Sequence, residues 1–348
     1  MTSAADTLET LLLPFNSGVL AWPTQGKVLF MRARTGAALN DAPQGILVCA
    51  QSFKPWVDAL KMDGHAIEGD VALSSEDQGF PIVLLLPPRQ REEARALLAE
   101  ALQRVAPGGV VVAAMANNEG ARTGEADLGR LAGSVQSLSK NKCRVFWAAA
   151  DARCDVALIN EWVILDAPRS IMDGRFLTRP GLFSWSHIDI ASALLARCLP
   201  SRLAGVGADL GSGFGYLAAE VLERCAGVTA FDLYEAEARG LELARLNLAD
   251  HAKRIPVDFI WHDVTGGLLE GRRYDFIVSN PPFHHGRADQ PEIGQAFIFA
   301  SANALVPGGR FWLVANRHLP YEEVLNRNFR KVRSVCVEQG FKVIEAIK

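Results

Sequence analysis

Two stretches of the sequence, far apart in the chain, follow the same pattern. Residues 81–118 read PIVLLLPP, REEARALLAEALQR, PGG and VVVAAMANN. Residues 276–316 read FIVSNPPF, FIFASANAL, PGG and RFWLVAN in the same order. Each stretch combines an apolar strand, a Pro-Pro pair, a helix, a turn and a second strand. Such an internal repeat indicates two copies of one structural unit, although convergent α/β patterning is the alternative. We therefore expect two α/β domains.

The second half of the chain alternates apolar runs with amphipathic stretches. Strands are predicted at residues 205–211, 228–232, 257–263, 274–280 and 310–316, and helices at 216–225, 235–250 and 294–305. This alternation predicts a parallel sheet with helices on both faces. Ligands of such sheets bind at the carboxyl ends of the strands. Four polar residues fall at the predicted ends: Asp209, Asp232, Asp263 and Asn280.

The sequence DLGSGFGY, residues 209–216, places three glycines where a strand turns into a helix. Glycine allows a tight turn and a close approach of the backbone to a ligand. Asp232 is predicted to end the next strand, where an acid can accept hydrogen bonds from both hydroxyls of a ribose. The turn matches neither the dinucleotide fingerprint nor a P-loop. These features predict a nucleoside cofactor.

The sequence SNPPFHHG, residues 279–286, follows the predicted fourth strand. Asn280 offers a carbonyl acceptor, and two prolines with fixed φ hold the following peptide carbonyls rigidly. The ring of Phe283 can stack on a base. This combination is suited to an amino group on a planar ring, and catalysis would come from positioning and electrostatics. A structural Pro-Pro loop with a packed phenylalanine is the alternative interpretation.

Other features narrow the classes of protein. Asp263 is placed to accept from an adenine amino group, or equally to cap a turn. His284 and His285 can contact substrate, but they lack a second ligand group at the spacing of a metal site, so no metal is expected. Six cysteines without a CxxC pair predict reduced thiols in the cytoplasm. No signal peptide and no apolar run that could span a bilayer are apparent, so no membrane partner is expected.

Residues 166–348 resemble class I S-adenosylmethionine-dependent methyltransferases. The pieces NPPFH, RPGLFSWSHIDIASALL, VANRHLPYEEVL and FKVIEAIK resemble the ribosomal RNA guanine-N2 methyltransferases, especially the 16S enzyme. One departure is Ala191, where that family often has glycine. The resemblance implies that S-adenosylmethionine is held by Asp209, Gly211, Gly213, Gly215, Asp232, Asp263 and Asn280. It also implies that the guanine is held by Asn280, Pro281, Pro282, Phe283 and His284.

Residues 1–165 repeat the pattern without its chemistry. Leu86 stands where Asn280 stands in the second copy, and Arg89 stands roughly where Phe283 stands. The predicted second strand ends in Gln51 rather than in an acid. We therefore expect two tandem Rossmann-like methyltransferase domains. The N-terminal one is expected to be degenerate and to serve RNA recognition or support, and the C-terminal one, residues 166–348, to be catalytic.

The sequence thus predicts an enzyme that methylates N2 of a guanine in 16S ribosomal RNA, working as a monomer on RNA or on the small ribosomal subunit. The sister activity on 23S RNA is the nearest alternative. An inert RNA-binding assembly factor is the alternative from a different class. The net charge is −3, so RNA binding would depend on local basic clusters. Candidates are residues 140–144 (KNKCR) and 327–333 (RNFRKVR).

Overall fold

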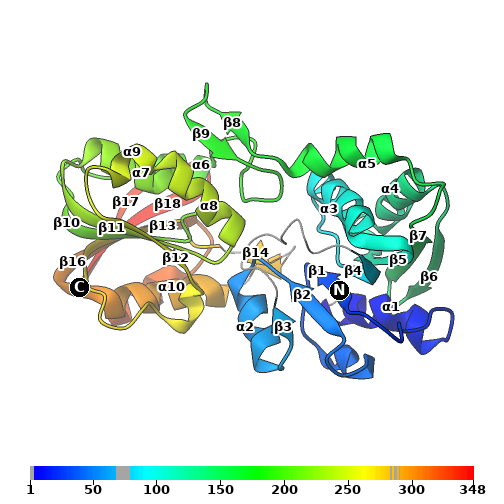
Figure 1. Cartoon of the computed structure of the whole chain (residues 1–348). Helices are drawn as coiled ribbons and strands as arrows, with labels where there is room; N and C mark the ends of the chain where they lie inside the picture. Colours follow the sequence, from blue (N-terminus) through cyan, green and yellow to red (C-terminus); the bar gives the residue numbers. More distant parts are fainter. Residues whose placement is uncertain (1–3, 68–78, 283, 286–287, 290) are drawn as a thin grey trace. The chain divides into compact units, whose positions relative to one another are not determined.

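The computed structural model describes residues 4–67, 79–282, 284–285, 288–289 and 291–348. The chain divides into two compact units (Figure 1). The N-terminal unit comprises residues 1–167 and 179–181, and the C-terminal unit comprises residues 168–178 and 182–348.

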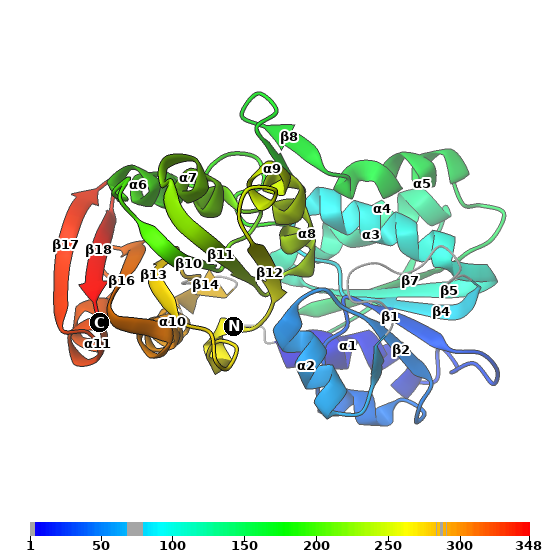
Figure 2. The ribbon, with the colours of Figure 1, turned by 60° about the vertical axis from the view of Figure 1, so that its left-hand side comes forward.

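The C-terminal unit is built on a seven-stranded sheet. Its strands are β10 (Ala204–Leu210), β11 (Gly227–Glu235), β12 (Val257–Trp261), β13 (Tyr274–Ser279), β16 (Leu305–Asn316), β17 (Lys331–Glu338) and β18 (Phe341–Ile347). They lie in the order β12-β11-β10-β13-β16-β18-β17, which can be followed in Figure 2. The first five strands are parallel, and β17 and β18 are antiparallel to their neighbours. The predicted parallel sheet is therefore confirmed, with an antiparallel pair at one edge.

Helices cover both faces of this sheet. They are α6 (Ile190–Cys198), α7 (Tyr216–Arg224), α8 (Ala238–Asn247), α9 (Ala249–Ala252), α10 (Pro291–Ala304) and α11 (Tyr321–Asn328). The helices α6, α7 and α8 bury leucines and alanines against one face, and α10 and α11 bury theirs against the other. A parallel sheet covered on both faces has strands that are apolar on both sides. This explains the nearly continuous apolar runs in the sequence.

The N-terminal unit repeats this architecture. Its strands are β1 (Val28–Met31), β2 (Leu47–Ala50), β3 (Ala66–Ile67), β4 (Phe80–Leu85), β5 (Val105–Ala116), β6 (Gln136–Lys140) and β7 (Cys143–Ala149). Their order, β3-β2-β1-β4-β5-β7-β6, matches that of the other sheet strand for strand. Its helices are α1 (Ala4–Asn16), α2 (Lys54–Met62), α3 (Arg91–Arg104), α4 (Ala121–Ala132) and α5 (Val156–Val163). The tandem Rossmann-like fold is thus confirmed.

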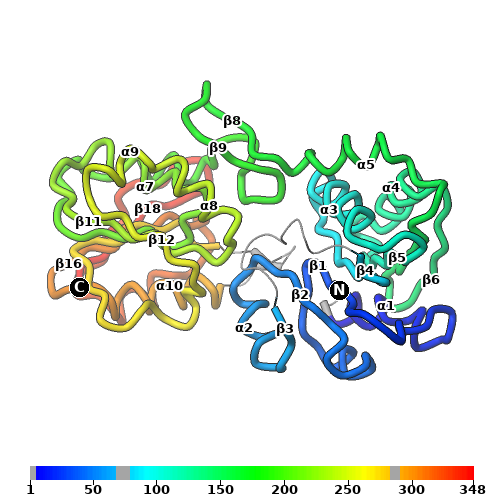
Figure 3. The backbone as a smooth tube through the Cα atoms, viewed as in Figure 1, coloured from blue at the N-terminus to red at the C-terminus, as the bar shows by residue number. Residues whose placement is uncertain are grey.

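Short elements complete the chain. They are the turns η1 (Ala37–Asp41), η2 (Asn117–Glu119), η3 (Ile164–Asp166) and η4 (Val264–Gly266), the hairpin of β8 (Arg169–Ile171) and β9 (Phe176–Thr178), and the short pair β14 (His284–His285) and β15 (Ala288–Asp289). Figure 3 traces the chain through the β8–β9 hairpin. The Asn247 side chain fixes this hairpin to α8, because it hydrogen-bonds both the amide and the carbonyl of Leu177, at 2.7 and 2.9 Å. Among the described residues, no helix combines the length and the apolar character needed to cross a membrane.

The central strand β10 tests how tightly the C-terminal core is packed. A Cβ on Gly207 would lie 2.3 Å from Phe276 Cζ and 2.8 Å from Phe231 Cδ2, and both rings are fully buried. We expect Gly207→Ala to lower the free energy of unfolding by roughly 1–3 kcal/mol, because both rings must move. Urea denaturation measures this. Gly266→Ala is the matched control, since a Cβ there meets nothing within 4 Å. Equal effects of the two changes would contradict the packing argument.

Candidate active site

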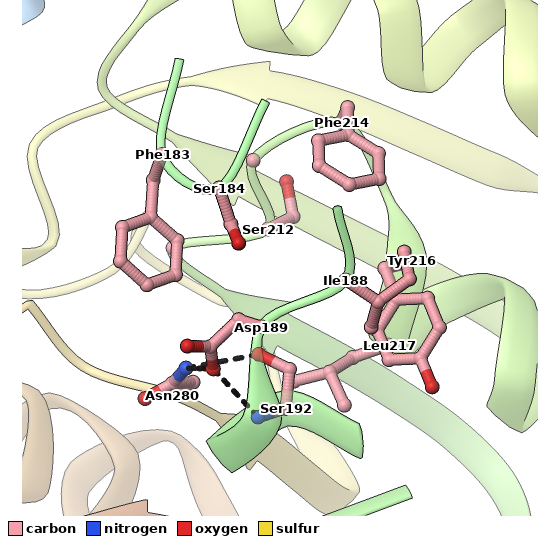
Figure 4. Close-up of a pocket in the computed structure, with 12 residues that line it drawn as sticks. Phe183, Ser184, Ile188, Asp189, Ser192, Ser212, Phe214, Tyr216, Leu217 and Asn280 are labelled. Atoms are coloured by element: carbon pink, nitrogen blue, oxygen red, sulfur yellow. Dashed lines mark hydrogen bonds between the residues drawn. The ribbon is translucent and has the colours of Figure 1, made fainter. Parts of the chain in front are cut away.

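A pocket lies at the carboxyl ends of β10 and β13 in the C-terminal unit (Figure 4). The loop after β10, the residue after β13 and the first turns of α6 and α7 form its walls. The lining residues are Phe183, Ser184, Ile188, Asp189, Ser192, Gly211, Ser212, Gly213, Phe214, Tyr216, Leu217 and Asn280. Three residues predicted from the sequence, Gly211, Gly213 and Asn280, therefore meet at one pocket. It lies where ligands of open parallel sheets bind.

The glycine turn after β10 has the conformation that its sequence predicts. Gly211, Gly213 and Gly215 have φ values of +74°, +55° and +89°, which favour glycine. A Cβ on Gly213 would meet nothing within 4 Å, so the backbone there is open to a ligand. Gly215 is needed for packing as well, since its Cβ would lie 3.3 Å from both Ala244 and Leu248.

The prediction that Asp232 ends the second strand is wrong. Strand β11 continues to Glu235, and Asp232 pairs with Ala208 inside the sheet. The carboxylate of Asp232 accepts a 2.6 Å hydrogen bond from the Tyr274 hydroxyl and lies 3.1 Å from Arg272. The strand continues because the next two residues, Leu233 and Tyr234, are fully buried. Asp232 thus belongs to a buried polar network and does not line the pocket.

Glu235 stands at the actual end of β11. One of its carboxylate oxygens accepts a 2.7 Å hydrogen bond from the amide of Gly213, and the other accepts one of 2.8 Å from the amide of Glu237. Burial raises the pKa of Glu235. The carboxylate joins the glycine turn to the neighbouring strand. Sequence reasoning missed this residue, although the apolar run that continues past Asp232 was the signal.

Asp209, the penultimate residue of β10, is fully buried next to the glycine turn. Neither of its carboxylate oxygens has a hydrogen-bond partner within the described part of the chain. Burial, together with the nearby carboxylate of Glu235, raises the pKa of Asp209 to about 8. A buried polar group without a partner is costly, so it indicates a functional role or a missing ligand.

Asn280 directly follows β13, as predicted. Its side-chain nitrogen donates two hydrogen bonds of 2.9 Å, one to the carboxylate of Asp189 and one to the hydroxyl of Ser192. Pro281 is buried and Pro282 is exposed. Sequence reasoning had not assigned a role to Asp189 or Ser192. Their positions in RPGLFSWSHIDIASALL, a piece that resembles the methyltransferase family, were the available signal.

The remaining predicted residues lie near the same edge of the sheet or outside the described residues. Asp263 follows β12 and caps the turn η4, where it accepts from the Thr265 amide and hydroxyl at 2.9 and 2.7 Å. Its contact with an adenine stays a prediction. Phe283 lies outside the described residues, and of His284 only the backbone, in strand β14, is described. Within the described ranges, no three metal-ligating side chains come together.

The lining also contains aromatic and aliphatic side chains without an assigned role. Phe183 is the most exposed of them, at 66%, and Figure 4 shows it on the same side of the pocket as Asn280. An exposed aromatic ring at a pocket offers a flat apolar surface to a planar ligand. Phe183 was not among the predicted site residues.

The strands of the N-terminal unit end in the same register as those of the C-terminal unit, but other residues follow them. Met31 of β1 pairs with Ala50 and Leu85, as Leu210 of β10 pairs with Tyr234 and Ser279. The residues that follow in the N-terminal unit are therefore the structural counterparts of Glu235 and Asn280. They are Gln51 and Leu86.

Gln51 performs the same structural task as Glu235 with the opposite polarity. Its side-chain nitrogen donates to the Ala33 carbonyl at 2.6 Å, and its oxygen accepts from the Ser52 amide at 2.9 Å. Leu86 is buried, with 3% of its surface exposed. The N-terminal unit thus retains the corner between its strands, but it has an amide where the C-terminal unit has the Glu235 carboxylate and an apolar side chain where it has Asn280.

The buried carboxyl of Asp209 makes stability depend on pH. Its pKa in the folded protein, about 8, exceeds the ordinary value of a carboxyl, so its contribution is fully present below that ordinary value and is lost progressively as the pH rises to about 8. We expect the Tm to fall between pH 5 and pH 8 and to change little above that. Asp209→Asn removes the titrating carboxyl and should flatten this dependence. Each kcal/mol of pH-dependent unfolding free energy corresponds to a Tm change of roughly 2–4 °C. Parallel curves for the two proteins, measured by calorimetry, would show that Asp209 does not titrate in this range.

Comparison with known proteins agrees with this geometry. A family model described as the methyltransferase small domain matches residues 173–345. The ribosomal RNA small subunit methyltransferase C of Psychromonas ingrahamii is 27% identical over 271 residues, which are 77% of this chain and 76% of that protein. The protein of the same name from Salmonella paratyphi A is 26% identical over 332 residues, which are 93% of this chain and 92% of that protein.

A solved structure shares the whole fold. It is that of the T. thermophilus 16S rRNA N2 G1207 methyltransferase (RsmC) in complex with AdoMet and guanosine. The TM-score is 0.80 at 22% identity, and the match covers 100% of this chain and 93% of that one. The family model, the relatives and the pocket at the strand ends agree: residues 173–345 match the methyltransferase small domain, and the chain is similar over most of its length to the ribosomal RNA small-subunit methyltransferases.

Proposed function

We propose that this enzyme transfers the methyl group of S-adenosylmethionine to the exocyclic N2 of a guanine in 16S ribosomal RNA. The hydrogen bonding of Asn280 is the observation that carries the proposal. The names of the relatives, and the guanosine in the RsmC complex, support the same substrate.

Asn280 can act only as an acceptor toward a ligand. A side-chain amide has two N–H donors and one carbonyl oxygen. Both donors are used, one on Asp189 and one on Ser192. The carbonyl oxygen is the group that remains, and it suits a substrate that donates, such as an exocyclic amino group. An ionised hydroxyl or carboxylate that accepted the methyl group would have no hydrogen to donate to the Asn280 oxygen, so it would not use this arrangement.

The strand ends of the C-terminal unit fit S-adenosylmethionine. The open backbone at Gly213 would hold the cofactor, Glu235, which is bonded to the Gly213 amide, would accept from its ribose hydroxyls in place of Asp232, and Asp263 would accept from its adenine. The cofactor supplies the activated methyl group, and the residues described here bind and orient the reactants.

Catalysis then depends on the position of the guanine amino group. The oxygen of Asn280 and the rigid carbonyl of Pro281 would accept its two hydrogens and stabilise the positive charge that develops on N2 as the new bond forms. A paired, stacked guanine cannot enter such a pocket, so the base must be flipped out or already unpaired. Phe183, and Phe283 by the sequence prediction, would supply surfaces for stacking.

The N-terminal unit would contribute to RNA binding or to support of its neighbour. Charges of the two predicted basic clusters form ion pairs, such as Lys140 with Glu9 at 2.6 Å and Arg333 with Glu345. The Lys140–Glu9 pair is exposed, so it contributes little free energy and can be exchanged for a contact with phosphate, whereas Glu345 is buried and also pairs with Arg310. We also propose that the protein acts in the cytoplasm and as a monomer. The six free cysteines support the cytoplasmic location.

The proposed activity can be tested directly. We expect 16S ribosomal RNA from a strain that lacks the gene to lose one N2-methylguanosine, as measured by mass spectrometry of nuclease fragments. The purified protein should restore it in the presence of S-adenosylmethionine. A missing methyl group in 23S RNA would assign the sister activity instead. Unchanged methylation of both RNAs would support the inert assembly factor.

Removing the acceptor oxygen should affect the chemical step more than binding of the cofactor. We expect Asn280→Ala to lower single-turnover methylation by about 100-fold or more, by analogy with the loss of one preorganised polar group. Calorimetry should show nearly unchanged affinity for S-adenosylmethionine. Turnover near that of the wild type would show that another group holds the guanine amino group.

Cofactor affinity should distinguish the two acids of β11. Glu235→Gln reproduces the residue found at the corresponding place of the N-terminal unit, so it should weaken binding of S-adenosylmethionine by about tenfold or more. Asp232→Asn should chiefly lower thermal stability, since its carboxylate contacts Tyr274 and Arg272. The reverse result in titration calorimetry would restore Asp232 as the ribose ligand.

A further inference from the structure

We infer that Asp189 is a positioning residue, which fixes the orientation of the Asn280 side-chain amide so that its oxygen faces the acceptor amino group. Ser192 is the second anchor of the same amide. The inference rests on the proposed function, because it concerns the same pocket. It assigns a task to a residue that acts through Asn280 rather than on the substrate.

The contacts define a compact arrangement (Figure 4). The Asn280 nitrogen lies 2.9 Å from the Asp189 Oδ2 and 2.9 Å from the Ser192 Oγ. The same Asp189 oxygen accepts a 2.7 Å hydrogen bond from the Ser192 amide. One carboxylate oxygen therefore caps the N-terminus of α6 and also holds the amide of Asn280.

The carboxylate determines which way the amide points. The two ends of an asparagine side chain have nearly the same shape, so packing alone does not choose between them. Reversing the amide would place its oxygen against the carboxylate of Asp189, which when ionised can only accept. A hydroxyl such as that of Ser192 can donate or accept, and it tolerates both orientations. Asp189 is therefore the residue that decides the orientation.

The position of Asp189 on α6 makes this anchor rigid. As the N-cap residue, Asp189 is held by the helix amide that it accepts from, and α6 buries Leu194 and Leu195 in the core. Asn280 itself lies outside β13, and residues 280–282 belong to no helix or strand. A functional side chain on such a segment is placed accurately only when a rigid neighbour supports it. Asp189 links the segment to the packed face of the sheet.

Substitutions at position 189 can separate positioning from helix capping. Serine also caps helices but is shorter by one bond, so Asp189→Ser should retain the cap and lose the contact with Asn280. Asparagine keeps the length and an acceptor oxygen, so Asp189→Asn should retain both. Asp155 caps α5 by accepting from the Leu158 amide at 2.9 Å, which makes Asp155→Ser the matched control.

The kinetic test uses full-length protein and protein-free 16S RNA or small subunits from a strain without the gene. We expect Asp189→Ser to lower kcat by about tenfold or more, with KM values changed by less than about threefold. Asp189→Asn should recover most of kcat, and Asp155→Ser should leave it unchanged. In the double variant, Asp189→Ser should lower kcat no further than Asn280→Ala does alone. Unchanged kcat in Asp189→Ser, or independent effects in the double variant, would overturn the inference.

A second measurement needs no activity. In protein labelled with ¹⁵N-asparagine, the signal lost in Asn280→Ala identifies the side-chain NH₂ of Asn280. Its hydrogens should exchange with solvent slowly in the wild type and at least about tenfold faster in Asp189→Ser. Equal exchange rates would show that Asp189 does not hold the amide. If the wild type protected this NH₂ but methylated no RNA, the proposed function would fail while the positioning by Asp189 stood.

Discussion

The parallel pairing of β10 with β11 on one side and with β13 on the other determines where chemistry can occur in this protein. Leu210 lies opposite both Tyr234 and Ser279, so the three strands end at one edge of the sheet. The glycine turn, Glu235 and Asn280 directly follow these three positions. Each contributes a different group: an open backbone, a carboxylate and an acceptor oxygen. Residues from distant parts of the chain therefore meet without any long functional loop of their own.

The N-terminal unit shows that this pairing does not by itself make an active site. Its three strand ends have the same register, yet they are followed by Arg32, Gln51 and Leu86. The Gln51 side chain still holds its strand to the neighbouring turn, but it donates to the backbone carbonyl of Ala33, whereas Glu235 accepts from the backbone amide of Gly213. The fold tolerates this exchange because either polarity satisfies the buried backbone groups. The architecture is retained at these positions, but an amide replaces the acid and leucine replaces asparagine.

The C-terminal unit contains, at and beside its pocket, buried polar groups that a purely structural domain would avoid. Asp209 is fully buried with no partner among the described residues, and burial raises its pKa to about 8. Asn280 is held by two anchors that leave its oxygen for a donor. Such local costs are typical of functional sites. The neighbouring network of Asp232 and Tyr274 is fully paired by comparison, as expected of a structural element.

The sequence alone determined the class of fold and two parts of the pocket, the glycine turn and Asn280. Alternating strands and helices implied a parallel sheet, the glycines implied a positive-φ turn, and Asn280 was correctly expected to follow a strand. These features depend on local periodicity and on conformations that only certain residues adopt. Tertiary structure decided that Glu235, not Asp232, ends β11, and that Asp189, 91 residues away in the sequence, holds Asn280. Where a strand ends depends on which neighbour buries it, and the partner of an amide depends on packing between distant segments, and neither is encoded in a local pattern.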